Sequence, residues 1–347
     1  MIKLACMGQL ACIILARPTA LNALNKEMIA TIHAALDEWE QDDVIKIVLI
    51  RSEHDDFFCA GGDVKAVYGQ RDSSLEHLVA FFQTEYMMNY RLKTFPKPIV
   101  SLINGICMGG GVGLGMHVAF PIAGEDIVFA MPETLIGLFP DVGASFILNQ
   151  LPCAWKHYVG IFGERLNATQ LAAFQLVKAV LTKDQWPQFI DELMASSDLA
   201  DCLKQHLTRP SHHDIPLPHP EFWRFAADDF GTMMAQLALG QGEFFHEIRV
   251  RQSHFSPLSM YMTFEQLHVT HGLGFKQCLA LDYRLIQHFL TASDFFEGVR
   301  AQMIDKDKKP KWKYQAWQDI PHELIKHFFS SDIHSRSNSI FKKDLDI

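Results

Sequence analysis

The sequence predicts an α/β fold that continues into a mostly helical C-terminal region. Across residues 1–160, short apolar strand patterns alternate with amphipathic helix patterns, the order expected of a sheet whose strands are joined by crossover helices. From about residue 152 onward helical patterns prevail, and no convincing strand run occurs. The chain has 347 residues, 48% of them hydrophobic and 20% charged. It can therefore bury a large core, as one α/β unit with an appendage or as two domains.

The first 50 residues predict two strands, a helix and a buried strand. Gly8 and Gln9 interrupt the N-terminal apolar run, so we expect two short strands joined by a turn, the second over 12–16. Asn25 is typical of a helix N-cap, and apolar residues recur after it at helical spacing: Met28, Ile29, Ile32, Leu36 and Trp39. The β-branched run at 44–50 is typical of a strand covered on both faces.

The rest of the chain repeats this alternation before it becomes helical. A glycine turn at 59–63 precedes a second amphipathic helix, whose apolar stripe is Leu75, Leu78, Phe82 and Tyr86. A strand at 99–103 leads into a glycine cluster that opens the next helix, and 127–130 is another short strand. Prolines and histidines at 210–220 indicate a loop and a candidate boundary, and 256–299 is predicted to be a helical hairpin.

Composition and charge argue against several classes of function. A net charge of −9 disfavours nucleic acid as a partner, because phosphate binding on that scale needs a clustered basic surface. The seven cysteines are odd in number and irregularly spaced, with no CxxC, which argues against disulfides and favours the reducing cytoplasm. Residues 98–124 carry no Asp, Glu, Lys or Arg, but their many glycines favour a buried strand, turn and helix over a membrane span. His268 and His271 have no third ligand at matched spacing, so we expect no metal site.

Two glycine turns are candidates for a catalytic role. Gly61 and Gly62 follow the strand that ends near Arg51, and the run at 109–111 follows the strand at 99–103. Both turns therefore come at the carboxyl ends of buried strands, where α/β proteins usually bind ligands. One backbone amide from each turn is a candidate donor to a developing oxyanion. Tight packing between helix and strand also selects glycine, so both interpretations remain open.

Three acidic residues are candidates for the chemistry. Glu133 is the only charged residue between 127 and 139, and a carboxylate among apolar residues has a raised pKa, which suits a general acid, base or nucleophile at neutral pH. Its place after Pro132 equally suits a solvated first turn of a helix. Asp141 suits a helix N-cap as well as a catalytic role. Glu85 follows two phenylalanines one helical turn earlier, so it lies at the rim of the core or points into a pocket.

Three motifs, each only suggestive alone, together resemble the enoyl-CoA hydratase/isomerase (crotonase) superfamily. They are FCAGGD at 58–63, NGICMGGGVG at 104–113 and MPETLIGLFPDVG at 131–143. Two later segments, DFFEGVR at 294–300 and PKW at 310–312, are similar to the 3-hydroxyisobutyryl-CoA hydrolase branch of that superfamily. The likeness runs from about residue 17 to residue 312 and weakens between about 180 and 250.

The resemblance implies a crotonase-type spiral of ββα units over 1–205, with a helical region at 206–347 that completes or covers the cleft. It implies an acyl-CoA substrate whose thioester carbonyl lies between the amides of Gly62 and Gly110, the oxyanion hole. The residues that match the superfamily's substrate site are Glu85, Gly110, Glu133 and Asp141, and of these Glu133 and Asp141 are expected to be catalytic.

The implied activity is hydrolysis of a short-chain hydroxyacyl-CoA, namely 3-hydroxyisobutyryl-CoA in valine breakdown. Glu133 would act as nucleophile or as general base, without a metal or organic cofactor. Gly113 stands where hydratases carry a second glutamate, so the alternatives are an enoyl-CoA isomerase or hydratase and a non-catalytic acyl-CoA-binding protein. Lys65, Arg300 and the basic cluster at 306–309 are candidates for holding the CoA phosphates, and self-association is left open.

Overall fold

The computed structural model describes residues 1–195, 206, 215–291 and 293–330. The chain divides into two compact units, each built from three segments of the sequence. Unit 1 comprises residues 1–62, 88–130 and 165–216, and unit 2 comprises 63–87, 131–164 and 217–347. The division expected between residues 205 and 206 falls beside stretches that lie outside the described residues.

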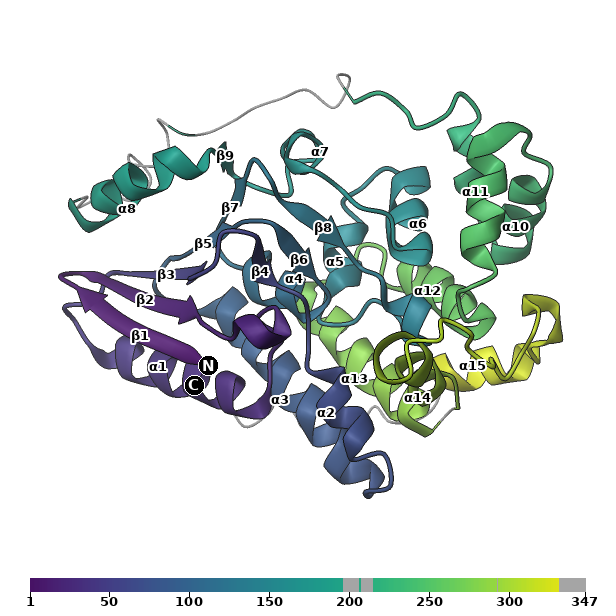
Figure 1. Ribbon diagram of the computed structural model, residues 1–347, viewed down its shortest axis with the longest axis horizontal. Helices are drawn as coiled ribbons and strands as arrows, with labels where there is room; N and C mark the ends of the chain where they lie inside the picture. Colours follow the sequence, from purple (N-terminus) through teal and green to yellow (C-terminus); the bar gives the residue numbers. More distant parts are fainter. Residues whose placement is uncertain (196–205, 207–214, 292, 331–347) are drawn as a thin grey trace. The chain divides into compact units, whose positions relative to one another are not determined.

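The larger sheet of unit 1 has six strands (Figure 1). Their spatial order is β1 (Ile2–Met7), β2 (Leu10–Leu15), β3 (Ile47–Ser52), β5 (Ile99–Ile103), β7 (Phe120–Gly124) and β9 (Ala179–Leu181). The first two strands form the antiparallel hairpin that the sequence predicts, and every later pair is parallel. One face of this sheet packs against α8 (Trp186–Ala195), whose Phe189 and Leu193 are fully buried.

A second, three-stranded sheet gives unit 1 its characteristic topology. It is parallel and contains β4 (Phe57–Cys59), β6 (Ile106–Met108) and β8 (Val128–Ala130) in that order. The consecutive pairs β3 and β4, β5 and β6, and β7 and β8 thus each place one strand in the large sheet and the next strand in the small one. Helices α2 (Val64–Gly69) and α3 (Leu75–Thr94) follow the first pair along the chain, and α4 (Gly110–Gly115) follows the second. The third pair is followed by a 3-10 helix at Glu133–Ile136. The predicted spiral of ββα units is confirmed.

Several strands differ from the predictions. The strand predicted at 44–50 begins only at Ile47, because Val44 is 63% exposed and its amide donates to the Asp42 carboxylate at 2.8 Å. The expectation of no strand beyond residue 152 is wrong, since β9 pairs with β7. Strands β4, β6 and β7 were not predicted either. Three of these four strands have three residues and β7 has five, too few for a periodic pattern to emerge before their partners are known.

The predicted helices lie where the sequence places them. Helix α1 (Lys26–Gln41) begins with the Asn25 side chain accepting a hydrogen bond from the Met28 amide at 2.9 Å. The region at 256–299 forms α12 (Pro257–Val269), α13 (Phe275–Thr291) and α14 (Ser293–Val299), and Ser256 caps the first of them. Part of the predicted 210–220 loop, residues 210–214, is outside the described residues.

Unit 2 is a helical assembly with a core rich in aromatic rings. Its other helices are α5 (Ala144–Leu148), α6 (Cys153–Phe162), α10 (Phe230–Ala238), α11 (Gly242–Gln252) and α15 (His322–Ser330). Rings from α6 pack on rings from the 3-10 helix at Phe222–Phe225, as in the contact of Tyr158 with Phe225 at 4.9 Å between centroids. Among the helices described, none is long and apolar enough to cross a membrane.

Candidate active site

The two predicted glycine turns lie side by side in unit 1. They follow the neighbouring parallel strands β4 and β6, in which Cys59 is paired with Cys107. Gly61 and Gly109 both have positive φ, +120° and +51°, a conformation that glycine adopts without strain. A Cβ placed on Gly61 would stand 3.6 Å from the Gly110 nitrogen. The amides that follow the two strands are therefore neighbours, as a pair of oxyanion donors requires.

Tight packing accounts for a different glycine of the same run. A Cβ on Gly111 would lie 2.2 Å from the Cys59 carbonyl oxygen, so the backbone of α4 touches the end of β4 directly. Gly110 is the first residue of α4, where the geometry of a helix leaves the amide without an intrahelical acceptor. The two interpretations of the glycine cluster thus apply to adjacent residues: Gly111 satisfies packing, and Gly110 presents an amide.

Substituting Gly111 by alanine is expected to destabilise the protein by about 3 kcal/mol or more, because the new methyl group must displace backbone rather than a flexible side chain. Gly69→Ala is the matched control, since Gly69 is exposed and a Cβ there would meet no atom within 4 Å. Urea unfolding followed by circular dichroism measures both variants. Equal stabilities for the two variants would contradict the packing of α4 on β4.

Glu133 is buried in unit 2 and not solvated. It opens the 3-10 helix η2 (Glu133–Ile136), and only 6% of it is exposed. The helix is fixed from both sides: the Leu138 amide donates to the Glu133 carbonyl at 3.0 Å, and the Thr134 hydroxyl donates to the Ile161 carbonyl at 2.9 Å. The carboxylate atom Oε2 of Glu133 is buried without a hydrogen-bond partner among the described residues. The solvated first-turn interpretation is therefore wrong.

Helix α14 holds η2 by direct backbone contact. A Cβ on Gly137 would lie 2.3 Å from the Asp294 carbonyl oxygen, and one on Gly298 would lie 2.3 Å from the Ile136 backbone. The two segments approach as closely as glycine permits, which leaves Glu133 little freedom to shift. This contact brings together the motifs at 131–143 and 294–300, which lie far apart in the sequence.

Asp141 is not a helix cap. The residue that caps α5 is Gly143, and the Asp141 carboxylate instead accepts a hydrogen bond from the Tyr86 hydroxyl at 2.7 Å. Tyr86 comes from α3 and is next to Glu85, which is 1% exposed and has a buried Oε1 without a partner in the part of the chain that the structure describes. Glu85, Glu133 and Asp141 are brought together in unit 2 as one cluster of buried carboxyl groups.

Burial raises the pKa of every carboxyl in this cluster, and charge repulsion adds to the shift of the two glutamates. Burial is the main cause that raises the pKa of Glu133 and of Glu85 well above the usual glutamate range, and the Asp141 charge adds to it. Burial also raises the pKa of Asp141 to about 6, although the hydrogen bond from Tyr86 partly opposes the shift. The cluster can therefore hold and release protons near neutral pH, as acid–base or nucleophilic chemistry requires.

Two buried residues that interact with Asp141 of the cluster, Tyr86 and Asp282, were not among the predicted site residues. The sequence places Tyr86 on an apolar stripe, and Asp282 on α13 was not predicted as a site residue. Asp282 is fully buried, and its carboxylate accepts hydrogen bonds from the Gly143 amide and the Gln266 side chain, both at 2.7 Å. A signal for Asp282 was present, because it occupies the buried stripe of an amphipathic helix, four residues after Cys278 and three before Leu285.

The basic residues that are candidates for binding the CoA phosphates differ in their ion pairs and their exposure. Arg300 is engaged with three carboxylates, those of Glu297, Asp305 and Asp307, at 2.6–2.8 Å. Its charge is neutralised by its own neighbours, which makes it a poor phosphate ligand. Lys65 and the lysines at 306–309 are exposed. Among the described residues, no group of His, Cys, Asp and Glu is arranged to hold a metal ion.

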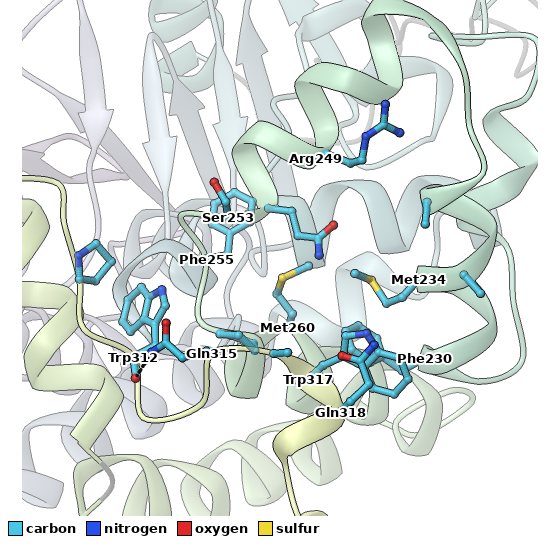
Figure 2. Close-up of a pocket in the computed structure, with 16 residues that line it drawn as sticks. Phe230, Met234, Arg249, Ser253, Phe255, Met260, Trp312, Gln315, Trp317 and Gln318 are labelled. Atoms are coloured by element: carbon cyan, nitrogen blue, oxygen red, sulfur yellow. Dashed lines mark hydrogen bonds between the residues drawn. The ribbon is translucent and has the colours of Figure 1, made fainter.

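A separate cavity of about 610 Å³ lies within unit 2 and is shown in Figure 2. It is lined mainly by apolar side chains of α10, α12 and the segment 310–318, with polar side chains from α11; among them are Phe230, Met234, Met260, Trp312, Trp317 and Arg249. None of the predicted site residues lines it. The cavity is therefore distinct from the carboxyl cluster.

Comparison with known proteins places these features in one family. Residues 10–329 match the enoyl-CoA hydratase/isomerase family. The chain is 34% identical over 340 residues to 3-hydroxyisobutyryl-CoA hydrolase, mitochondrial, from Xenopus tropicalis, which covers 95% of this chain and 88% of the relative. It is 32% identical over 329 residues to 3-hydroxyisobutyryl-CoA hydrolase 1 from Arabidopsis thaliana, covering 90% and 87%.

Solved structures agree with the fold. An enoyl-CoA hydratase from Rhodobacter sphaeroides 2.4.1 superposes with a TM-score of 0.85 at 31% identity, over 95% of this chain and 97% of that one. A carnitinyl-CoA dehydratase from Mycobacterium thermoresistibile gives 0.84 at 25% identity, over 95% and 96%. With the split-strand topology and the family match over most of its length, this chain belongs to the enoyl-CoA hydratase/isomerase (crotonase) family.

Proposed function

We propose that this protein hydrolyses a short-chain hydroxyacyl-CoA thioester, with 3-hydroxyisobutyryl-CoA as substrate and 3-hydroxyisobutyrate and CoA as products. The observation that carries the proposal is the buried cluster of Glu85, Glu133 and Asp141 in a chain whose relatives bear the name of that hydrolase. Such a cluster is destabilising by itself, because like charges share a dry site, and buried groups with raised pKa values are concentrated at functional sites.

The amides of Gly62 and Gly110 are assigned to the thioester carbonyl. Their turns follow adjacent parallel strands, which supports the assignment of both N–H groups to one oxygen. Donors fixed in this way stabilise the oxyanion of a tetrahedral intermediate, and the loss of one such donor typically lowers kcat about 10²–10³-fold.

Glu133 is assigned the role of attacking the thioester carbonyl carbon or of activating the water that does so. As a nucleophile, a carboxylate oxygen bonds to the carbonyl carbon, the carbon–sulfur bond breaks, and CoA leaves as a thiolate that takes up a proton. Water then attacks the resulting mixed anhydride and releases the hydroxy acid and the free Glu133 carboxylate. As a general base, Glu133 instead takes a proton from the attacking water. Both routes require the ionised carboxylate, so activity rises with pH through the pKa of this buried group.

Asp141 and Glu85 are assigned to the acyl group. The Tyr86 hydroxyl donates to one Asp141 oxygen and so fixes the plane of that carboxyl. Glu85 has an oxygen without a partner among the described residues, and a substrate hydroxyl would satisfy it. These two groups thus favour an acyl chain that carries a hydroxyl, the class to which 3-hydroxyisobutyryl belongs.

In the proposed reaction CoA is part of the substrate, and neither a metal nor an organic cofactor is required. Hydrolysis of 3-hydroxyisobutyryl-CoA would be a step in valine degradation.

The exposed lysines at 65 and 306–309 remain our candidates for binding the CoA phosphates. We also propose the cytoplasm as location, because the cysteines in the described part of the chain, Cys6, Cys12, Cys59, Cys107, Cys153 and Cys278, form no disulfides; the animal relatives are named mitochondrial.

Release of free thiol from a panel of acyl-CoAs tests the proposal. We expect the purified protein to liberate CoA from 3-hydroxyisobutyryl-CoA and to act more slowly on the same chain without the hydroxyl. The alternative is an enoyl-CoA isomerase or hydratase, and the Rhodobacter structure is named a hydratase; either activity changes the acyl chain without liberating thiol. Binding of acyl-CoA without any turnover would instead indicate a non-catalytic binding protein. Either result would overturn the proposed hydrolysis.

A further inference from the structure

The turn that carries Asp141 is held at both ends by two buried side chains. At its start, Gln266 Nε2 on α12 donates to the Pro140 carbonyl at 2.9 Å. At its end, the Gly143 amide donates to Asp282 Oδ2 on α13 at 2.7 Å. The same Gln266 nitrogen donates to Asp282 Oδ1 at 2.7 Å, so the two side chains are joined into one clamp. Both have 0% of their surface exposed.

The clamped turn has a conformation that its sequence does not favour. Val142 has a φ of +53°, a value that β-branched residues rarely adopt, and Gly143 follows with +74°. The ring of Phe275, the first residue of α13, packs so closely that a Cβ on Gly143 would lie 2.3 Å from it. A strained residue directly after Asp141 persists only where its surroundings fix it, and the clamp provides two of the contacts that do so.

The clamp specifically requires a carboxylate at position 282. Two N–H donors, one from the backbone and one from an amide, converge on Asp282, and a carboxylate offers one acceptor oxygen to each. Asparagine, which has nearly the same shape, would keep one acceptor and turn an NH₂ group toward the Gln266 donor. The buried stripe of α13 would otherwise suit an apolar residue, which avoids the cost of burying a charge.

We propose that Asp282 and Gln266 are positioning residues, which hold the Pro140–Gly143 turn so that Asp141 is presented to the substrate. This inference rests on the proposed function, in which Asp141 acts on the acyl group. The groups that face Asp282 and Asp141 within unit 2 are Glu85 and Tyr86 from α3, Glu133 from η2 and Cys278 from α13. Neither positioning residue needs to touch the substrate.

A double-mutant cycle with Asp141→Asn tests the proposal. In the wild-type background we expect Asp282→Asn to lower kcat/KM about 10–100-fold, as a misplaced catalytic group does. In the Asp141→Asn background the same change should lower it less than about 3-fold, because the residue through which it acts is already altered. A purely structural role would give the same loss in both backgrounds, and that result, or no loss in the wild type, would overturn the proposal.

Two further variants keep the test decisive. Gln266→Met removes the donor to both Pro140 and Asp282 while keeping a similar shape, so it should show the same coupling to Asp141 even where Asp282→Asn fails to fold. Phe245→Leu, a change to a buried ring of α11, is a control for lost stability, and its kcat/KM should stay within about 2-fold of the wild type.

A crystal structure of Asp282→Asn separates this inference from the proposed function. If the wild type liberates no thiol, the proposed function fails. The clamp is then tested only by comparing the conformation of the 140–143 turn in the variant with that in the wild type. A rearranged 140–143 turn, with Val142 no longer at positive φ, supports the clamp. An unchanged turn in that variant contradicts it, whatever the activity of the wild type.

Discussion

Glu133→Gln is expected to abolish most of the turnover of 3-hydroxyisobutyryl-CoA and to leave its binding largely intact. Glutamine has the same shape but can neither attack the carbonyl carbon nor take a proton from water, so we expect a loss of about 10³-fold or more in kcat. Binding should persist because the amides of Gly62 and Gly110 are unaffected by the change. Thiol release measures turnover, and calorimetric titration with the thioester measures binding.

The matched control for this variant is Glu125→Gln, the same substitution at an exposed glutamate of unit 1. It should hydrolyse the thioester at the wild-type rate. A Glu133→Gln protein that turned over as fast as this control would show that the attack is made by another group or by water alone.

Asp141→Asn is expected to move activity and stability in opposite directions. Activity should fall about 10²-fold, since the carboxylate that acts on the acyl group is lost. At pH 7 the variant should nevertheless be more stable than the wild type, by up to about 3 kcal/mol, because the pKa of Asp141 is raised from 3.8 to about 6 in the folded protein. Asparagine still offers an oxygen to the Tyr86 hydroxyl.

The sign of this effect follows from proton binding. Between pH 4 and pH 6 the folded protein holds a proton on Asp141 that the unfolded chain has begun to lose, so the free energy of unfolding decreases as the pH rises. Above the raised pKa the full penalty is present. The raised pKa values of Glu85, Glu133 and Asp282 act in the same direction, and each is increased by the Asp141 charge.

Urea unfolding at several pH values between 4 and 7 measures this linkage. The wild type should lose stability across the range while its kcat/KM rises, and the Asp141→Asn curve should be flatter. Parallel stability curves for the two proteins would mean that Asp141 has an ordinary pKa in the fold. The wild-type behaviour is that of a site whose working, ionised state is the one least favoured by the folded protein.

The acids of the cluster were predictable one by one, because each has an unusual local sequence. Glu133 is alone among apolar residues, and Asp141 lies in a Phe-Pro-Asp-Val-Gly context. What the sequence left open was the choice between ordinary and catalytic roles. That choice depends on tertiary contacts, above all the Tyr86 hydrogen bond, which spans 55 residues and replaces the helix cap that local rules favour.

Asp282 shows the limit of reasoning from periodicity. Its helix was predicted, and an acid on the buried stripe was visible, but a stripe does not reveal which atoms face it. The partners of Asp282 are a backbone amide 139 residues away and a glutamine on the preceding helix. Neither can be inferred before the two helices and the turn are packed together.

The strands that were not predicted also depend on contacts between segments far apart in the sequence. The residues of β4, β6 and β9 are too few for alternation to be recognised, and they become strands only by pairing with neighbours. The two glycine turns, in contrast, were predicted at the right positions, because runs of glycine mark places where the backbone turns or makes close contacts. Their closeness follows from the parallel pairing of β4 with β6.

The central claim is that two main-chain N–H groups from adjacent turns polarise the thioester carbonyl. Isotope-edited infrared spectroscopy tests it directly, with substrate labelled by ¹³C at the carbonyl and bound to the Glu133→Gln protein. We predict that the carbonyl stretch moves to lower frequency on binding, as hydrogen bonding weakens the carbon–oxygen double bond. A stretch that stays at the frequency of the free thioester would contradict the claim.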